Sequence, residues 1–181
     1  MKLKGKVAVI TGSSRGMGKL VALEMAKEGV KVVINGTTPE PVDEVVREIQ
    51  ASGGQAVASY DSVVTMEGGQ RIVRTAIDNF GRIDVLVNNA AITRDRSLIK
   101  MTEEDWDSVI SVDLKGVFTC TKAVLKAGVI AFTKTCAKEL GRYNITVNVI
   151  SPSHKTRMYD NIPDEVFKKI VASRVYLYRL R

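Results

Sequence analysis

Residues 7–18 read VAVITGSSRGMG, a short apolar run followed at once by three closely spaced glycines. Val7 to Ile10 are apolar at consecutive positions, which is typical of a strand covered on both faces of a sheet. Glycine has no side chain and accepts positive φ, so Gly12, Gly16 and Gly18 permit a tight turn and a close approach of the backbone to a diphosphate. The first turn of the following helix would offer its N–H groups to the same ligand. The segment therefore predicts a phosphate-binding turn between a buried strand and a helix.

The alternation of strand and helix continues along the first ninety residues. It is typical of βαβ units on a parallel sheet. We therefore expect one α/β domain over residues 1–181, with a doubly wound parallel sheet (a Rossmann fold) in three α/β/α layers. After the strand at 7–10, the expected helices are 16–28, 39–52 and 67–80, and the expected strands are 31–35, 55–59 and 83–87.

The alternation stops after the fourth strand. Thr102-Glu103-Glu104-Asp105 resembles a capping box that begins a helix, and no strand pattern occurs from Thr102 to Leu140. A straight helix of that length would measure about 58 Å, whereas a compact domain of this size is about 40 Å across. Either residues are deleted near Lys126 or a segment is missing from this sequence, and we favour the second interpretation. A strand at 145–150 and a helix at 163–172 should follow. We thus expect a fold that is incomplete around the fifth strand and at the C-terminus.

Two further segments contain candidate binding residues in addition to the glycine turn. Asn88-Asn89-Ala90-Ala91 follows the fourth strand, and Asp61 lies just past the third. With the spacing Gly-x-x-x-Gly-x-Gly, these residues resemble the short-chain dehydrogenase/reductase family. The resemblance implies that the turn binds a dinucleotide, that Asp61 contacts the adenine of this cofactor, and that Asn88 and Ala90 stabilise the sheet beside the cofactor. A plain turn residue at 88 and a helix cap or turn at 61 are the alternatives.

The end of the second strand bears on the choice of cofactor. It reads Asn35-Gly36-Thr37-Thr38, where an NAD-binding chain would carry an acidic residue for the ribose 2′-hydroxyl. Arg15 lies within the turn, where its guanidinium could pair with a 2′-phosphate; an exposed, solvated side chain is the alternative. We expect NADP, with NAD possible. The predicted cofactor-binding residues are Gly12, Ser14, Arg15, Gly16, Met17, Gly18, Asn35, Asp61, Asn88, Ala90 and Thr156.

The resemblance also implies a catalytic group of serine, tyrosine, lysine and asparagine. Asp113 stands at the asparagine position, where a carboxylate could accept hydrogen bonds but would alter the proton relay; an ordinary helix residue is the alternative. Residues 126–134 resemble the segment that begins at the catalytic lysine, which makes Lys126 the candidate. Four residues earlier stands Lys122 rather than a tyrosine, so the serine and tyrosine have no recognisable counterpart.

Residues 89–95, 105–107 and 114–118 look most like the 3-oxoacyl-acyl-carrier-protein reductases. The resemblance implies hydride transfer between a nicotinamide cofactor and a carbonyl or alcohol substrate, either a small molecule or an acyl thioester such as a 3-oxoacyl thioester. Because the serine and tyrosine are absent, the alternative is a catalytically inactive dinucleotide-binding protein that acts as a sensor or assembly subunit. In relatives the fourth and fifth helices pair between subunits, so a homo-oligomer is expected.

Composition and charge argue against several other classes. The net charge is +7, but the charges are scattered, and no basic stripe interleaved with aromatic residues marks a nucleic-acid-binding surface. No apolar run reaches the roughly 18 residues that would span a bilayer. Two cysteines without a CxxC spacing and a single histidine argue against a metal site or a disulfide framework. We therefore expect a cytoplasmic protein without a metal, a nucleic-acid partner or a membrane association.

Overall fold

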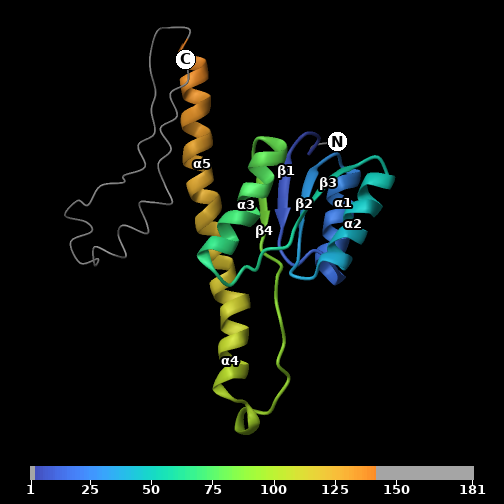
Figure 1. Cartoon of the computed structure of the whole chain (residues 1–181), viewed down its shortest axis with the longest axis vertical. Coiled ribbons are helices and arrows are strands. Elements are labelled where there is room, and N and C mark those ends of the chain that lie inside the picture. The colour runs from blue at the N-terminus through green and yellow to red at the C-terminus, as the bar shows by residue number, and fades with distance from the viewer. Residues whose placement is uncertain (1–2, 142–181) are drawn as a thin grey trace, which may run out of the picture. The chain divides into compact units, whose positions relative to one another are not determined.

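The computed structural model describes residues 3–141, with side chains described as far as residue 128 (Figure 1). The chain divides into two compact units, Met1–Gly128 and Val129–Arg181, and the sheet belongs to the first. The expectation of one domain over residues 1–181 stays a prediction. In chain order the elements are β1 (Val7–Ile10), α1 (Gly16–Lys27), β2 (Lys31–Asn35), α2 (Pro39–Ala51), β3 (Gln55–Ser59), α3 (Met66–Phe80), β4 (Val85–Val87), η1 (Leu98–Lys100), α4 (Glu103–Val109), η2 (Ile110–Leu114) and α5 (Lys115–Gly141).

The sheet is parallel throughout, with the strand order β3-β2-β1-β4. Val9 of β1 lies opposite Val33 of β2 on one side and opposite Leu86 of β4 on the other. The chain thus moves outward from β1 to β3 and then returns to the free edge of β1. Ligands of doubly wound sheets bind where the strand order reverses, outside the carboxyl ends of the strands. The predicted doubly wound sheet is confirmed, and the glycine turn lies at this reversal.

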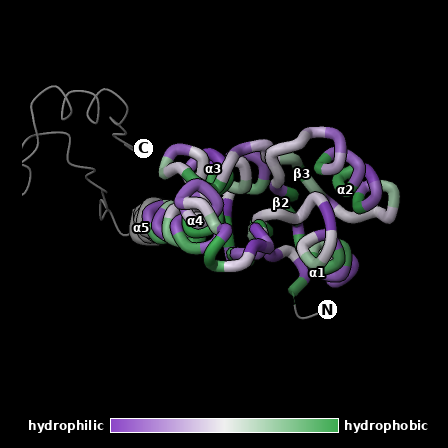
Figure 2. Tube along the Cα trace, turned by 90° about the horizontal axis from the view of Figure 1, so that it is seen from below, coloured by the Kyte–Doolittle hydropathy of each residue, from purple (hydrophilic) through white to green (hydrophobic). Residues whose placement is uncertain are grey.

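Consecutive apolar residues on the strands enter two separate cores, one on each face of the sheet. In Figure 2, β2 and β3 lie between α3 and the pair α1 and α2. The strands are therefore covered on both faces, which is why β1 is apolar at every position. The core on the α1 and α2 side includes Ala8, Ile10, Ala22 and Val45, and the core on the α3 side includes Val7, Val9, Ile72 and Cys120.

The predicted elements are found with small shifts at their ends. The strand expected from Ile83 begins at Val85. Asp84 instead makes two bonds with Val7: its N–H donates to the Val7 carbonyl oxygen, and its carboxylate accepts the Val7 N–H, each at 2.9 Å. The helices α1 and α2 end one residue earlier than expected, and α3 begins one residue earlier. Helix ends commonly shift by a residue or two, because the terminal turns lack part of their hydrogen bonds.

From Glu103 to Gly141 the chain is helical, as the sequence predicts. The Thr102 hydroxyl accepts the Asp105 N–H at 3.1 Å, and the Asp105 carboxylate accepts the Thr102 N–H at 3.3 Å, so the capping box is confirmed. One π-helical turn, η2, joins α4 to α5, and no strand lies between residues 102 and 141. The strand expected at 145–150 and the helix expected at 163–172 lie outside the described residues. Within residues 3–141, no helix is long and apolar enough to cross a membrane.

Candidate functional site

A cleft of about 570 Å³ opens at the carboxyl ends of the strands. Its walls come from the loops that follow the four described strands, the last residue of β2, the first turn of α1 and one residue of η2, so segments far apart in the sequence meet there. This is the place where doubly wound sheets bind their ligands. The lining residues are Gly12, Ser14, Arg15, Met17, Gly18, Asn35, Gly36, Thr37, Thr38, Asp61, Ser62, Val63, Asn89, Ala90, Ala91, Ile92 and Val112.

Two glycines allow the loop after β1 to lie against the loop after β4. Gly12 has a φ of +61°, and a Cβ on it would lie 2.7 Å from the Ala90 Cα. A Cβ on Gly18 would lie 2.6 Å from the Gly12 carbonyl oxygen and would also collide with the Asn89 side chain. Because backbone atoms cannot yield as a flexible side chain can, both positions require glycine. They leave bare backbone at the wall of the cleft, as a diphosphate-binding turn needs.

Asn89 braces this junction between the two loops. Its Nδ2 donates to the carbonyl oxygens of Thr11 and Gly12 at 2.9 and 3.0 Å. The Thr11 hydroxyl accepts in return from the backbone N–H groups of Asn89 and Ala90 at 3.0 and 3.1 Å. Asn88 faces a different partner, because its Nδ2 donates to the Thr121 hydroxyl of α5 at 3.2 Å. Asn89 therefore links the end of β4 to the glycine turn, and Asn88 links it to α5.

The N-terminus of α1 has no capping side chain. Arg15 occupies the N-cap position without a side-chain capping bond, and the first turn contains no acidic residue. Two other helices differ: Thr65 accepts the Gly68 N–H at 3.0 Å at the start of α3, Thr102 caps α4, and both helices carry acidic residues in their first turns. The helix α2 also lacks a side-chain cap, but its first turn carries Glu40. Open N–H groups and the positive end of the helix dipole attract an anion. The start of α1 is thus suited to a phosphate group.

Asn35 holds three strand ends together at the base of the cleft. Its side chain is buried; Nδ2 donates to the carbonyl oxygens of Ser59 and Asp61 at 3.2 and 2.9 Å, and Oδ1 accepts the Gly12 N–H at 3.4 Å. Its backbone N–H donates to the Ser13 hydroxyl at 2.9 Å, and its carbonyl accepts the Ser13 N–H at 2.8 Å. Asn35 lines the cleft, as expected of a cofactor residue, but its amide group is used to hold the surrounding loops.

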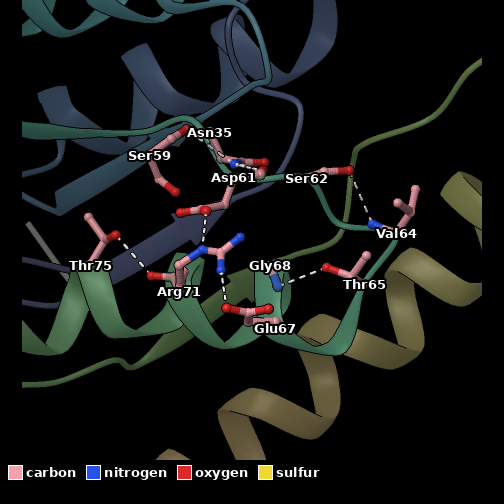
Figure 3. Close-up of polar contacts among 10 residues, drawn as sticks. All are labelled: Asn35, Ser59, Asp61, Ser62, Val64, Thr65, Glu67, Gly68, Arg71 and Thr75. Atoms are coloured by element: carbon pink, nitrogen blue, oxygen red, sulfur yellow. Dashed lines mark hydrogen bonds and ion pairs between the residues drawn. The ribbon is translucent and has the colours of Figure 1, made fainter.

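Asp61 lies in the wall of the cleft next to β3 and is held from two sides (Figure 3). Its carbonyl oxygen accepts the Asn35 amide, and its carboxylate accepts the Nε–H of Arg71, which lies on α3. Nη1 of Arg71 donates to the Glu67 carboxylate at 2.6 Å. The hydrogen bond to Asp61, with smaller contributions from Coulombic attraction to both carboxylates, raises the pKa of Arg71 above its ordinary value. Arg71 therefore lies between two carboxylates and forms an ion pair with each of them.

Asp113 supports the opposite wall of the cleft. It lies in the π-helical turn η2, and its Oδ1 accepts the Ile92 N–H at 2.9 Å. Ile92 and Val112, the residue before Asp113, both line the cleft. Single π-turns inside helices often mark functional sites, because the extra residue redirects the side chains around it. Asp113 thus fixes the loop after β4 without lining the cleft itself.

Most of the predicted cofactor residues meet in this cleft, whereas the predicted catalytic residues do not line it. Gly16, the first residue of α1, and Asn88 are not among the lining residues. Lys126 lies in α5, and Thr156 lies outside the described residues. Among the predicted residues, those lining the cleft are Gly12, Ser14, Arg15, Met17, Gly18, Asn35, Asp61 and Ala90.

Several polar residues line the cleft without having been predicted from the sequence. Their common signal is position, since each stands within a few residues of the carboxyl end of a parallel strand. They are Thr37, Thr38, Ser62 and Asn89. Across the part of the chain that the structure describes, no group of three or more His, Cys, Asp or Glu side chains could hold a metal ion.

Two family models match the chain in succession. That of the short chain dehydrogenases matches residues 6–127, and that described as enoyl-(acyl carrier protein) reductase matches residues 123–180. The two matches meet at residues 123–127, where the sequence pattern is interrupted near Lys126. This agrees with the expectation that the fold is incomplete around the fifth strand.

Similarity to an individual protein agrees with the matches to the family models. The chain is 42% identical to a 3-oxoacyl-[acyl-carrier-protein] reductase of Synechocystis sp. over 197 residues, which cover 90% of this chain and 80% of the relative. Since the chain has only 181 residues, part of the aligned relative has no counterpart here.

Solved structures are similar as well. A short chain dehydrogenase from Mycobacterium avium matches with a TM-score of 0.67 at 34% identity, over 80% of this chain and 52% of that one. A short chain dehydrogenase from Burkholderia cenocepacia J2315 in complex with NADP matches with a TM-score of 0.67 at 28% identity, over 81% of this chain and 73% of that one. The chain thus spans about half the length of the mycobacterial protein.

Proposed function

The chain belongs to the short-chain dehydrogenase family, a class of oxidoreductases, and we propose that it binds NADP and transfers a hydride between this cofactor and a carbonyl or alcohol substrate. The open N-terminus of α1 carries this proposal. Gly12 in the preceding turn and Gly18 in the first turn of α1 keep side chains away, so a diphosphate could approach the helix amides directly. The residues present therefore fit a dinucleotide.

The lining beside α1 favours NADP over NAD. Thr37 and Thr38 after β2 and Ser14 after β1 offer hydroxyl groups, and Arg15 offers a guanidinium, so a 2′-phosphate would meet donors and a positive charge. No acidic residue stands at the end of β2, where it would repel that phosphate. The similarity to a structure described as a complex with NADP supports the same choice.

Dinucleotides lie across the reversal of a doubly wound sheet, with one half on each side. We therefore assign the adenine half to the side of β2 and β3, where Asp61 lies, and the nicotinamide half to the loop after β4. The bound nicotinamide supplies or accepts the hydride. Asp113 keeps the Ile92 amide in place on that side. Lys126 is assigned to the proton relay at the substrate oxygen, because residues 126–134 resemble the family segment that begins at the catalytic lysine.

A 3-oxoacyl thioester is the proposed substrate class, supported by the similarity to a reductase of that name. We also propose a cytoplasmic homo-oligomer. The exposed apolar side chains of Leu114, Phe118 and Leu125 recur along one side of η2 and α5, which suits a helix-to-helix contact between copies. The comparisons give no support to an inactive binding protein.

An activity assay tests this function. The protein is incubated with NADPH and a panel of 3-oxoacyl thioesters and simple ketones, and oxidation of the cofactor is followed by its absorbance. We expect turnover with NADPH and an acyl thioester. Binding of NADPH without turnover of any substrate in the panel would instead identify an inactive dinucleotide-binding protein.

A further inference from the structure

A carboxylate in the wall of the proposed phosphate-binding cleft would repel the phosphate groups of the ligand. Asp61 lines the cleft, and its side chain is 25% exposed. An unpaired charge there would repel an anionic ligand within the screening distance of about 8 to 10 Å. Arg71 lies outside the lining but is the ion-pair partner of this carboxylate. The structure therefore places a compensating cation directly behind an acidic cleft residue.

Arg71 is held in position by its own element. It projects from the start of α3, where the Thr65 cap fixes the first turn and Nη1 is bound by Glu67 at 2.6 Å (Figure 3). A Cβ on Gly68 would collide with the Ser62 carbonyl oxygen, so this turn packs directly against a residue of the cleft wall. The start of α3 and the segment 61–62 thus form one packed unit.

Asp61 is fixed at two points before any ligand arrives. Asn35 binds its carbonyl oxygen at 2.9 Å, and Arg71 binds Oδ1 of its carboxylate. A carboxylate has about four acceptor positions, so the Arg71 bond leaves capacity for an N–H donor of a ligand. Fixing a binding group in advance reduces the entropy lost on binding.

We propose that Arg71 is a positioning residue for the adenine half of the cofactor site, where it orients the Asp61 carboxylate and offsets its charge. The inference rests on the proposed function and extends it to a residue that does not touch the ligand. Because Arg71 acts on the β3 side only, its removal should weaken ligands that contain the adenine half. Ligands confined to the nicotinamide half should bind unchanged.

Calorimetric titration of the full chain with two probes tests the proposal. One probe is 2′,5′-ADP, which represents the adenine half, and the other is nicotinamide mononucleotide. For R71Q we expect about three- to tenfold weaker binding of 2′,5′-ADP, the range for loss of one charged hydrogen bond at a half-exposed site. Binding of nicotinamide mononucleotide should not change. The matched control is R74Q, which removes the same charge from α3 at a residue that pairs with Asp78.

A double mutant separates positioning from a general structural role. If Arg71 acts through Asp61, adding R71Q to D61N should cause no further loss of 2′,5′-ADP binding. Equal binding of 2′,5′-ADP by wild type, R71Q and R74Q would overturn the inference while leaving the proposed function intact. Parallel loss of both probes in R71Q would overturn it too, because that pattern reports a disturbed fold. If the wild type binds neither probe, the proposed function itself fails.

Discussion

A Cβ on Gly12 would lie 2.7 Å from the Ala90 Cα, and this approach joins the glycine turn to the loop after β4. The two residues come from opposite sides of the strand-order reversal, and both line the cleft. Neither partner can withdraw easily, since Asn89 and Thr11 bond the same two loops together. The shape of the candidate site thus depends on the absence of a single side chain.

Replacing Gly12 by alanine should disrupt both the fold and the site. The new Cβ would meet backbone and would occupy a φ of +61°, so we expect a loss of about 2 to 4 kcal/mol in the free energy of unfolding. Denaturant unfolding measures this loss. Gly16 is the matched control, because its φ is +56° but no atom lies within 4 Å of its Cβ position. Gly16→Ala should cost only about 1 kcal/mol, and an equal cost for both variants would contradict the packing argument.

Asp113 should act mainly through its hydrogen bond to Ile92. Asp113→Asn keeps an oxygen acceptor and should change the free energy of unfolding by less than about 0.5 kcal/mol. Asp113→Ala leaves the Ile92 N–H without its partner and should cost about 1 to 2 kcal/mol. Thermal unfolding of both variants checks this order. If asparagine proved as damaging as alanine, the negative charge rather than the acceptor would be what matters.

Asp84 should make stability depend on pH in acid. Burial opposes its ionisation, but hydrogen bonds from Arg82, the Val7 N–H and Lys6 outweigh that effect and lower its pKa below the ordinary value. A carboxyl group with a lowered pKa in the folded state stabilises the protein above its unfolded pKa of about 4 and loses this contribution as the pH falls through the folded pKa.

The variant Asp84→Asn tests this dependence. It should be less stable than wild type at pH 7, and the difference should shrink below about pH 4. Denaturant unfolding at several pH values gives the comparison. Asp78→Asn, which alters an exposed ion pair, serves as the control and should have little effect at any pH. A constant difference for Asp84→Asn across this range would contradict the assignment.

Arg15 should contribute to the choice between NADP and NAD. Arg15→Ala removes the guanidinium from the cleft wall, so the Michaelis constant for NADPH should rise about tenfold or more while that for NADH changes little. Lys19→Ala is the control, since Lys19 follows on the same helix but pairs with Glu48 and does not line the cleft. A wild-type preference for NADH would refute the proposed cofactor.

The fold and the centre of the site follow from short-range signals in the sequence. The apolar run at Val7–Ile10 indicates a strand that is buried on both faces of the sheet. The glycines after it indicate a backbone that lies very close to other atoms. Both are local consequences of the parallel sheet. The Thr102 capping box is equally local, and it too is confirmed.

Contacts between distant segments could not be predicted in this way. Nothing in the sequence around Arg71 indicates that its partner is Asp61, because only the packing of α3 against the end of β3 brings them together. The use of the Asn35 amide by Ser59 and Asp61 is likewise a product of the assembled sheet. Thr37 and Thr38 line the cleft because the carboxyl ends of the parallel strands lie side by side in the fold. The sequence around these two residues does not indicate that arrangement.

The proposed function depends most on the open N-terminus of α1 as a binding site for a diphosphate. Isothermal calorimetry of the folded protein with NADPH, and separately with NADH, tests this directly. We predict saturable heat with NADPH and weaker binding of NADH. Absence of heat with both coenzymes would contradict a dinucleotide site at this helix terminus.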